Sequence, residues 1–354
     1  MIGLKVNASK SYEVLIGDGL INSVVELVSP VCKSKKVAVI TDDIVDSLYG
    51  RVVLNSLSKA GFAVSKMVFK NGEGSKNVAT LSDIWEFLAE NSFTRSDMLV
   101  ALGGGVVGDM TGFVAATYMR GVNFVQIPTT LLAAVDASIG GKTAIDLVHG
   151  KNLAGAFWQP SLVICDCDIL RKLPKNLFND GMAEVIKHGI LRDETILECV
   201  ERGAILDELE QIIEKNLVIK RWYVEADEHD YGIRQQLNFG HTVGHAIEKI
   251  SNFTLSHGQA VAYGMIIESR IANRMGICSN EALERIERVV KPILSEMNCY
   301  DASQIVVLMR TDKKSDADNV HIILPKRIGD CASYTFSYKQ MEDLLSHINT
   351  ALCF

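Results

Sequence analysis

The sequence lacks several features that would place the protein in a special class. No uncharged apolar run is long enough to span a membrane, and the N-terminus has no apolar segment of the kind that directs secretion. The eight cysteines are scattered without a Cys-x-x-Cys pair, which predicts reduced thiols rather than a disulfide framework. The net charge of −7 gives no electrostatic reason to expect a nucleic-acid partner. We therefore expect a cytoplasmic protein that binds neither membrane nor nucleic acid.

Internal repeats and low-complexity linkers are also absent, so the domain organisation follows from length and pattern alone. At 354 residues the chain is too long for one ordinary hydrophobic core. Hydrophobic residues make up 48% and charged residues 22%, which is typical of a folded globular protein. A change of hydrophobic pattern near residue 172 predicts two domains, residues 1–172 and residues 173–354.

The first half alternates short apolar runs with helical patterns. Apolar runs that end in glycine or polar residues are typical of buried parallel strands. The predicted strands are 36–40, 63–69, 98–102, 124–127 and 162–165, and helices such as 77–91 and 108–119 lie between them. This predicts an α/β domain with a Rossmann-like parallel sheet, which binds its ligand at the carboxyl ends of the strands. From about residue 176 to 297 the apolar spacing is helical throughout, which predicts an all-α C-terminal domain.

A glycine-rich turn follows the strand predicted at 98–102. Gly103, Gly105 and Gly108 satisfy G-x-G-x-x-G between a strand and a helix, where glycines let the backbone approach a diphosphate. In the common dinucleotide fingerprint the ribose-binding acid comes about 20 residues after the turn. The candidate acid here, Asp42, comes before it. The pattern therefore predicts either an unusual dinucleotide site or a tight turn needed only for packing.

Two lysines lie in glycine-rich loops further along the chain. Lys142 follows two glycines and precedes Thr143, but the P-loop pattern fails because Asp136 stands where its first glycine should be. Lys151 directly follows Gly150. Cations in such loops suit a phosphate or a carboxylate. Solvated surface lysines are the alternative.

The segment from Arg234 to His245 concentrates reactive side chains. His241 and His245 are four residues apart and would share one face of a helix, with Asn238 just before them. A third histidine, His257, begins another apolar helical run. Because imidazole is the commonest metal-binding side chain, we predict a metal site that binds an anionic, hydroxylated small molecule. The alternative is a pair of helix histidines hydrogen-bonded in a polar interior.

Glu184 offers a carboxylate for the same site. Its neighbours show the apolar spacing of a buried helix. A buried carboxylate is costly unless it forms an ion pair or coordinates a metal. Glu184 with two histidines and one open position would match a catalytic zinc site of the His2Glu type.

Together these segments resemble the 3-dehydroquinate synthase family, within the sugar-phosphate cyclase superfamily, and the resemblance covers nearly the whole chain. The segments that carry it are 103–109, 116–122, 125–133, 138–145, 150–160, 181–189 and 238–246. The resemblance implies a dehydroquinate synthase-like fold, with an N-terminal NAD-binding α/β domain, an all-α C-terminal domain and a metal in the cleft between them. It also implies a homodimer.

The resemblance assigns roles to individual residues. It implies that Zn²⁺ or Co²⁺ is bound by Glu184, His241 and His257. It implies catalytic roles for Lys142, Lys187, Arg234, Asn238 and His245. The substrate would also be bound by Asn152, by Lys220, by one of Lys313 and Lys314, and by Arg120 of the neighbouring subunit. NAD would be held by Asp42, Glu73, Lys76, Gly104, Gly105, Asp109, Thr129, Thr130, Lys142 and Lys151.

The implied reaction belongs to the shikimate pathway of aromatic amino-acid biosynthesis. The family, a group of carbon–oxygen lyases, converts a phosphorylated sugar acid, 3-deoxy-D-arabino-heptulosonate 7-phosphate, to 3-dehydroquinate and phosphate. NAD transiently oxidises C5, phosphate leaves by β-elimination, the hydride returns, and the ring opens and closes again by an intramolecular aldol step. The metal lowers the pKa of the C5 hydroxyl, and His245 would relay its proton. No net redox change is expected.

Three positions depart from the family pattern. Asp230 replaces a usual Glu, Lys172 replaces a usual Thr at a position tied to NAD, and Asn123 replaces a usual Arg. None of them is an implied metal ligand.

Two alternative functions stay open. Another sugar-phosphate cyclase would act on a different phosphorylated sugar, but Asn238, His245 and the Lys313–Lys314 pair favour the dehydroquinate member. A metal-dependent polyol dehydrogenase would accumulate NADH and would not need so many cations.

Overall fold

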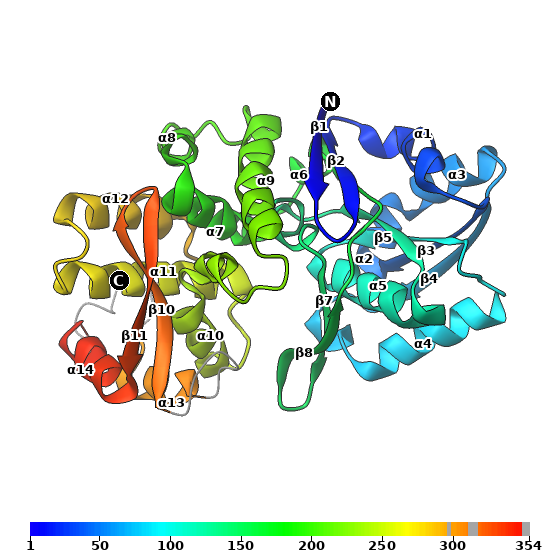
Figure 1. The fold of residues 1–354 in the computed structure, drawn as a ribbon. Coiled ribbons are helices and arrows are strands. Elements are labelled where there is room, and N and C mark those ends of the chain that lie inside the picture. Colours follow the sequence, from blue (N-terminus) through cyan, green and yellow to red (C-terminus); the bar gives the residue numbers. More distant parts are fainter. Residues whose placement is uncertain (296–298, 311–317, 349–354) are drawn as a thin grey trace. The chain divides into compact units, whose positions relative to one another are not determined.

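The computed structural model describes residues 1–295, 299–310 and 318–348, and Figure 1 shows its elements. The chain divides into two compact units. The first comprises Met1–Leu173 and Leu209–His229, and the second comprises Pro174–Glu208 and Asp230–Phe354. The first division falls one residue beyond the expected boundary, and the segment Leu209–His229 belongs to the first unit although the expected domains assigned it to the second.

The first unit is built on a seven-stranded sheet. Its strands lie in the order β1 (Ile2–Asn7), β2 (Ser11–Gly17), β9 (Leu162–Asp166), β6 (Asn123–Pro128), β5 (Met98–Gly103), β3 (Lys36–Asp42) and β4 (Ala63–Phe69). The pair β1–β2 is antiparallel and all other neighbours are parallel, which confirms the Rossmann-like α/β prediction. The β1–β2 hairpin was not predicted, because its residues alternate between buried and exposed and form no continuous apolar run.

Helices and helical turns connect these strands (Figure 1). They are η1 (Leu20–Ser23), α1 (Val24–Val28), η2 (Ser29–Val31), α2 (Asp43–Val45), η3 (Asp46–Gly50), α3 (Arg51–Lys59), η4 (Glu73–Ser75), α4 (Val78–Glu90), α5 (Gly105–Thr117), η5 (Tyr118–Arg120), η6 (Ala133–Ala137), α6 (Cys167–Leu170) and α9 (Leu209–Ala226). A separate antiparallel hairpin consists of β7 (Lys142–Leu147) and β8 (Gly150–Phe157).

The sheet has an apolar core on each face, because side chains alternate along its strands. On β5, Met98, Val100 and Leu102 pack in one cluster with residues of α1 and α3. Leu99 and Ala101 pack in the other cluster with residues of α4 and α5. Both faces are therefore covered by helices, as a parallel sheet requires.

Helix α9 is tied to the first unit by charged side chains near its C-terminus. The backbone N–H of Asn7 donates to Glu225 (2.7 Å), and that of Ser9 donates to Glu228 (2.8 Å). The Gln159 amide also donates to Glu228 at 2.8 Å. These bonds join α9 to the β1–β2 turn and to the segment after β8, so α9 is part of the first unit although it is distant in sequence.

The second unit is mainly helical, as predicted, and also contains a two-stranded hairpin. Its elements are α7 (Lys175–Arg192), α8 (Glu194–Glu201), η7 (Ile233–Asn238), α10 (His241–Ile250), α11 (His257–Arg274), α12 (Asn280–Val290), η8 (Lys291–Ile293), α13 (Ala302–Met309), β10 (Asn319–Arg327), β11 (Asp330–Ser337) and α14 (Tyr338–Ile348). One apolar core joins α10, α11, α13, α14 and both strands.

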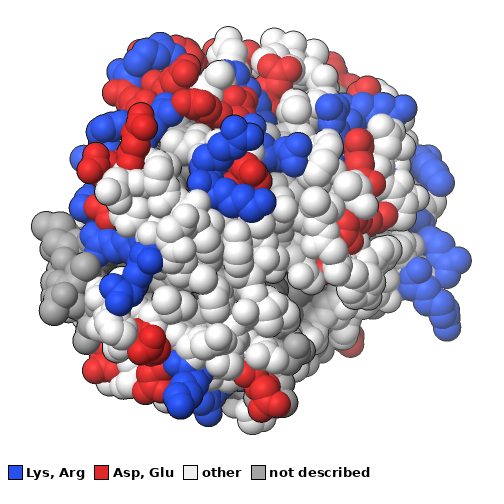
Figure 2. All heavy atoms as spheres, turned by 60° about the vertical axis from the view of Figure 1, so that its left-hand side comes forward, with Lys and Arg blue, Asp and Glu red and all other residues white. Residues whose placement is uncertain are grey.

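Charged side chains lie on the surface of the protein, and one of the described cysteines is disulfide-bonded. On the face shown in Figure 2, acidic and basic side chains are intermixed above a broad uncharged area. In the second unit Arg285 pairs with Glu194 and Glu201 and so links α8 to α12. Cys299 is disulfide-bonded, so the expectation of reduced thiols fails at this residue. Among the described residues, no helix is both long and apolar enough to cross a membrane.

Helices α10 and α11 pack so closely that glycine is required on both. A Cβ at Gly240 would lie 2.6 Å from Met265 Cγ, and one at Gly244 would lie 2.8 Å from the carbonyl oxygen of Ala260. A Cβ at Gly264 would overlap the backbone of Gly240, with the carbonyl carbon only 2.7 Å away. Real Cβ atoms do not approach other atoms this closely, so these three glycines set the spacing of the two helices.

We expect Gly264→Ala to destabilise the second unit by about 2 kcal/mol, because the new methyl group would push against backbone that cannot rotate away. Urea denaturation followed by circular dichroism would measure the free energy of unfolding. Gly74→Ala is the matched control, since a Cβ there meets no atom within 4 Å. Equal unfolding free energies for the Gly264→Ala and native proteins would contradict the close packing of α10 on α11.

Candidate active site

Several expected NAD-binding residues lie at the carboxyl edge of the sheet in the first unit. Asp42 ends β3, Gly104 and Gly105 follow β5, and Thr129 and Thr130 follow β6. Strands β3 and β6 are the two neighbours of β5, so the structure brings these residues to one edge. The N–H of Thr129 donates to the carbonyl of the last β5 residue at 3.0 Å, which holds the two turns together.

The glycine turn serves both packing and access. A Cβ at Gly108 would lie 2.6 Å from the Gln126 amide oxygen, so this glycine is needed for packing. At Gly105 a Cβ would meet only Ala137 at 3.7 Å, an ordinary contact. Gly104 precedes α5 without any side-chain hydrogen bond to the helix start. The protein therefore leaves space and N–H groups at the start of α5, where a diphosphate could bind.

Lys76 is the centre of a charged cluster at the start of α4. Its ammonium lies 2.6 Å from the Asp109 carboxylate and donates to the Asn152 amide oxygen at 2.5 Å. Glu73 lies 4.0 Å from Lys76 and 3.9 Å from Lys151. Burial alone would lower the pKa of Lys76, but Asp109 and Glu73 outweigh it and raise that pKa. The cluster thus keeps a permanent cation beside two expected NAD contacts.

Asp146 connects two residues of this cluster, although no sequence motif pointed to it. Its N–H donates to the Lys76 carbonyl at 2.8 Å, and its carboxylate accepts the N–H of Asn152 at 2.8 Å. Asn152 has a positive φ of 53°, an uncommon conformation that asparagine tolerates. The only hint in the sequence was the spacing, because Asp146 stands six residues before Asn152 and a tight hairpin brings such residues together.

Three other expected substrate-binding residues of the first unit lie on elements outside the Lys76 cluster. Lys220 on α9 is buried and forms an ion pair with Asp136 of η6 at 2.6 Å. In the sequence Asp136 stood out only because it replaces the first glycine of the P-loop pattern, and that replacement was the one indication of a separate role. Lys142 begins β7 and is exposed. Arg120 is exposed and has a positive φ of 62°, directly after Met119 with a φ of 49°.

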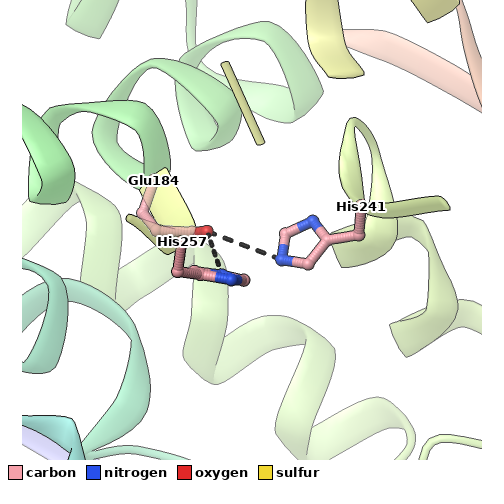
Figure 3. A group of neighbouring side chains, drawn as sticks. All are labelled: Glu184, His241 and His257. Carbon is pink, nitrogen blue, oxygen red and sulfur yellow. Dashed lines mark ion pairs between the residues drawn. The ribbon is translucent and has the colours of Figure 1, made fainter. Parts of the chain in front are cut away.

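In the second unit the three expected metal ligands converge (Figure 3). Glu184 comes from α7, His241 begins α10 and His257 begins α11. Glu184 Oε1 lies 3.6 Å from His241 Nε2 and 3.7 Å from His257 Nε2. Tetrahedral zinc bonds of 2.0–2.1 Å separate two ligand atoms by roughly 3.3 Å. The three side chains are therefore arranged as ligands of one ion would be, and they form a candidate metal cluster.

Two carboxylates, of which Glu268 is buried and Asp180 half-buried, fix the helix starts that carry the histidines. Asp180, one turn before Glu184 on α7, accepts the N–H of Gly258 at 2.6 Å at the start of α11. Glu268 of α11 accepts the N–H groups of Gly240 and Val243 at 2.7 and 3.2 Å at the start of α10. Each helix start thus has one or two of its first N–H groups bonded to a carboxylate from a neighbouring helix.

Charge around the cluster favours ligands in their metal-binding forms. Burial would raise the pKa of Glu184, but Lys187 and the two imidazoles outweigh it and hold that pKa well below its usual value. Burial and Lys187 lower the pKa of His241, which is therefore neutral. Burial would lower the pKa of His257, but Glu184 and Glu248 raise it to about 10, so a metal ion would displace a proton there.

The remaining expected residues of the second unit lie close to the cluster in sequence, and some lie close to it in space. The ring of His245 lies 5.5 Å from that of His241 and 6.0 Å from that of His257, centroid to centroid. Lys187 is buried and forms an ion pair with Glu184. Arg234 and Asn238 lie on η7, which ends before α10 because Gly240 adopts a left-handed φ of 78°. The segment is therefore two helical elements with a break between them.

Lys313 and Lys314 lie outside the described residues. Among the departures from the family pattern, Asn123 accepts a hydrogen bond from Lys10 at 2.9 Å, Asp230 has a positive φ of 62°, and nothing in the structure explains Lys172.

Comparison with known proteins supplies the family. The family models of the 3-dehydroquinate synthase N-terminal and C-terminal parts match residues 66–180 and 181–315. A 3-dehydroquinate synthase of Clostridium acetobutylicum is 42% identical over 91% of this chain and 92% of its own length.

Solved structures share the fold over almost the whole chain. A 2-deoxy-scyllo-inosose synthase, solved with carbaglucose-6-phosphate, NAD⁺ and Co²⁺, has a TM-score of 0.89 at 25% identity and covers 98% of this chain and 100% of its own. A 2-epi-5-epi-valiolone synthase from Streptomyces hygroscopicus, with NAD⁺ and Zn²⁺ bound, has a TM-score of 0.86 at 23% identity, with 98% and 100% covered. Both family models match, and the 42% identity to a 3-dehydroquinate synthase extends over more than nine-tenths of the chain. This chain therefore belongs to the 3-dehydroquinate synthase family.

Proposed function

We propose that this chain converts 3-deoxy-D-arabino-heptulosonate 7-phosphate to 3-dehydroquinate and inorganic phosphate, as a carbon–oxygen lyase that depends on NAD and a divalent metal. The observation that carries the proposal is the convergence of Glu184, His241 and His257 from three helices. The 42% identity to a 3-dehydroquinate synthase supports the choice of reaction. A bound NAD would supply reversible hydride transfer at C5, and a bound metal would polarise the hydroxyl group there.

The donor set fits zinc or cobalt. Two imidazole nitrogens and one carboxylate oxygen leave one position open for a substrate oxygen, which is the composition of a catalytic zinc site. Glu184 is only 1% exposed, and such a carboxylate needs positive charge nearby. Lys187 supplies one charge and the metal would supply more. Two similar structures were solved with Co²⁺ and with Zn²⁺, which supports either ion.

The first unit supplies what NAD needs. The start of α5, with Gly104 and Gly105, would bind the diphosphate, because no side chain caps this helix start and the first N–H groups of a helix suit an anion. We further assign NAD contacts to Asp42, Glu73, Lys76, Asp109, Thr129, Thr130, Lys142 and Lys151. We also propose domain limits that follow the two compact units, with α9 counted in the NAD-binding domain.

Cationic and amide side chains would bind the substrate's anionic ends. Lys187 and Arg234 are 1% and 2% exposed, so their charges are held in place and can orient a phosphate or carboxylate without being screened by water. Asn238 and Asn152 would bind hydroxyl groups. The remaining substrate contacts are proposed for Lys142, Lys220, Lys313 and Lys314.

His245 is the proposed proton relay for the oxidation step. It lies on α10, one turn after His241, with its ring next to both ligand rings. An imidazole there can take the proton that leaves the substrate hydroxyl and return it when the hydride comes back. Its exposed fraction is intermediate, which lets the proton exchange with solvent.

We propose a cytoplasmic homodimer in which Arg120 acts on the neighbouring subunit's substrate. The uncommon backbone at Met119 and Arg120 supports a functional role for this turn, because positive φ values cost energy and persist where they serve a purpose. Arg95 holds the turn by donating to the Met119 carbonyl at 3.1 and 2.8 Å.

The reaction can be tested with metal-stripped protein resupplied with Zn²⁺ and NAD⁺. We expect metal-dependent phosphate release from the heptulosonate phosphate without any accumulation of NADH, because the hydride returns in each turnover. His257→Ala should lower the rate on the order of 100-fold or more, since metal catalysis supplies several kcal/mol of transition-state stabilisation. Phosphate release and absorbance at the NADH band would be followed together.

The same assay separates the alternatives. A hexose 6-phosphate, which lacks the carboxylate, serves as the comparison substrate, and preference for it would indicate another sugar-phosphate cyclase. NADH that accumulates with glycerol-like alcohols while no phosphate is released would indicate a polyol dehydrogenase and would refute the proposed reaction.

The proposed role of Arg120 in a dimer predicts complementation between two inactive variants. Arg120→Ala and His257→Ala should each be inactive alone. After subunits are mixed, half of the dimers are hybrids with one complete site, so about a quarter of the native sites should be restored. Phosphate release measures this recovery. No recovery in verified hybrid dimers would mean that Arg120 acts within its own subunit.

A further inference from the structure

The imidazole of His257 lies between two carboxylates that face different ring nitrogens. Its Nε2 lies 3.7 Å from Glu184 Oε1, and its Nδ1 lies 3.9 Å from Glu248 Oε2. Glu248 is on the last turn of α10, two turns after His241, and its side chain is only 5% exposed. Glu248 belongs to no motif recognised in the sequence, and the proposed reaction uses it in no step.

The other histidine of the cluster has a comparable arrangement with a different partner. His241 Nε2 faces Glu184, and its Nδ1 is hydrogen-bonded to the Phe239 carbonyl oxygen at 3.2 Å. In both histidines, therefore, Nε2 faces the shared carboxylate and Nδ1 faces a different oxygen. For His241 this oxygen is a neutral carbonyl, and for His257 it is a carboxylate.

We propose that Glu248 is a positioning residue for the metal site: its carboxylate faces Nδ1 of His257, would accept the proton there when the metal is bound, and so fixes the tautomer that presents Nε2 to the metal. The inference rests on the proposed metal dependence. A neutral imidazole carries one N–H, and a partner that accepts it at Nδ1 leaves the lone pair on Nε2. A carboxylate in this position raises the electron density of the ligand nitrogen.

Helix α10 would then serve the site twice. Its first residue, His241, is a ligand, and Glu248 near its end orients a ligand that belongs to α11. The helix start is held by Glu268 through Gly240 and Val243. The short segment from Ser251 to Ser256 connects the two helices, so Glu248 and His257 are near each other in sequence as well as in space.

The test measures metal affinity, which does not depend on turnover. Full-length metal-stripped protein would be titrated with Co²⁺ by its visible absorption and with Zn²⁺ in competition with a chelator. Glu248→Ala removes both the acceptor and the charge, whereas Glu248→Gln keeps an acceptor oxygen. Glu287→Gln is the control, because Glu287 is ion-paired to Arg270 at 2.7 Å in the same unit but faces no histidine in any described contact.

We expect Glu248→Ala to weaken metal binding between about 10- and 100-fold, the usual effect of losing such a partner, and Glu248→Gln to weaken it less. Glu287→Gln should bind as the native protein does. Equal affinity of the native and Glu248→Ala proteins would overturn the proposal. Native protein that binds neither metal would instead refute the proposed metal dependence, so the two failures are distinguishable.

A second measurement holds even if Glu248→Ala folds poorly. In zinc-loaded native protein with ¹⁵N-labelled histidine, the nitrogen shifts of His257 should show a proton on Nδ1 and metal on Nε2. The signal is assigned by its loss in His257→Gln. In Glu248→Gln the Nδ1 proton should remain but exchange faster with water. Zinc on Nδ1 of His257 would overturn the proposal.

Discussion

A carboxylate removed from water must be accompanied by positive charge, and Glu184 imposes this requirement on the second unit. An isolated buried ion is unfavourable by several kcal/mol even after the protein relaxes. Lys187 lies one helical turn away on α7 and neutralises the charge in part. The starts of α10 and α11 then bring two imidazoles to the same oxygen. One buried charge thus constrains three helices, which meet where that charge is best compensated.

Close helix packing is the means by which this charge is surrounded. Gly240, Gly244 and Gly264 remove the side chains that would hold α10 away from α11. Gly258 does the same where α11 meets α7, because a Cβ there would overlap the backbone of Asp180. Gly240 directly precedes His241, and Gly258 directly follows His257. The close packing at these glycines therefore fixes where the two expected metal-binding histidines begin their helices.

The parts that could be predicted from the sequence are those with a strong local signal. Strands β3, β4, β5, β6 and β9 are mostly apolar, and the structure confirms them, whereas the alternating strands β1, β2, β7 and β8 gave no comparable signal. Glu184 and the histidines could be selected because few residue types bind metals, whereas the choice of His257 rather than His245 rested on the family resemblance. Glu248 and Glu268 could not, since their importance lies in which ring nitrogen or backbone N–H each one faces. That depends on how α10 and α11 meet in three dimensions.

Helix α9 has a consequence for the order in which the protein can fold during synthesis. The chain leaves the first unit after Leu173, returns with Leu209 and leaves again after His229. The N-terminal unit therefore lacks a packed element until the ribosome has made more than fifty residues beyond its sheet, and α7 and α8 must wait for their own partners during this interval. A fragment that stops at Leu173 would lack Glu225 and Glu228, which accept the backbone N–H groups of Asn7 and Ser9 in the full protein. Because neither unit is continuous along the nascent chain, neither can complete its packing before part of the other has been synthesised.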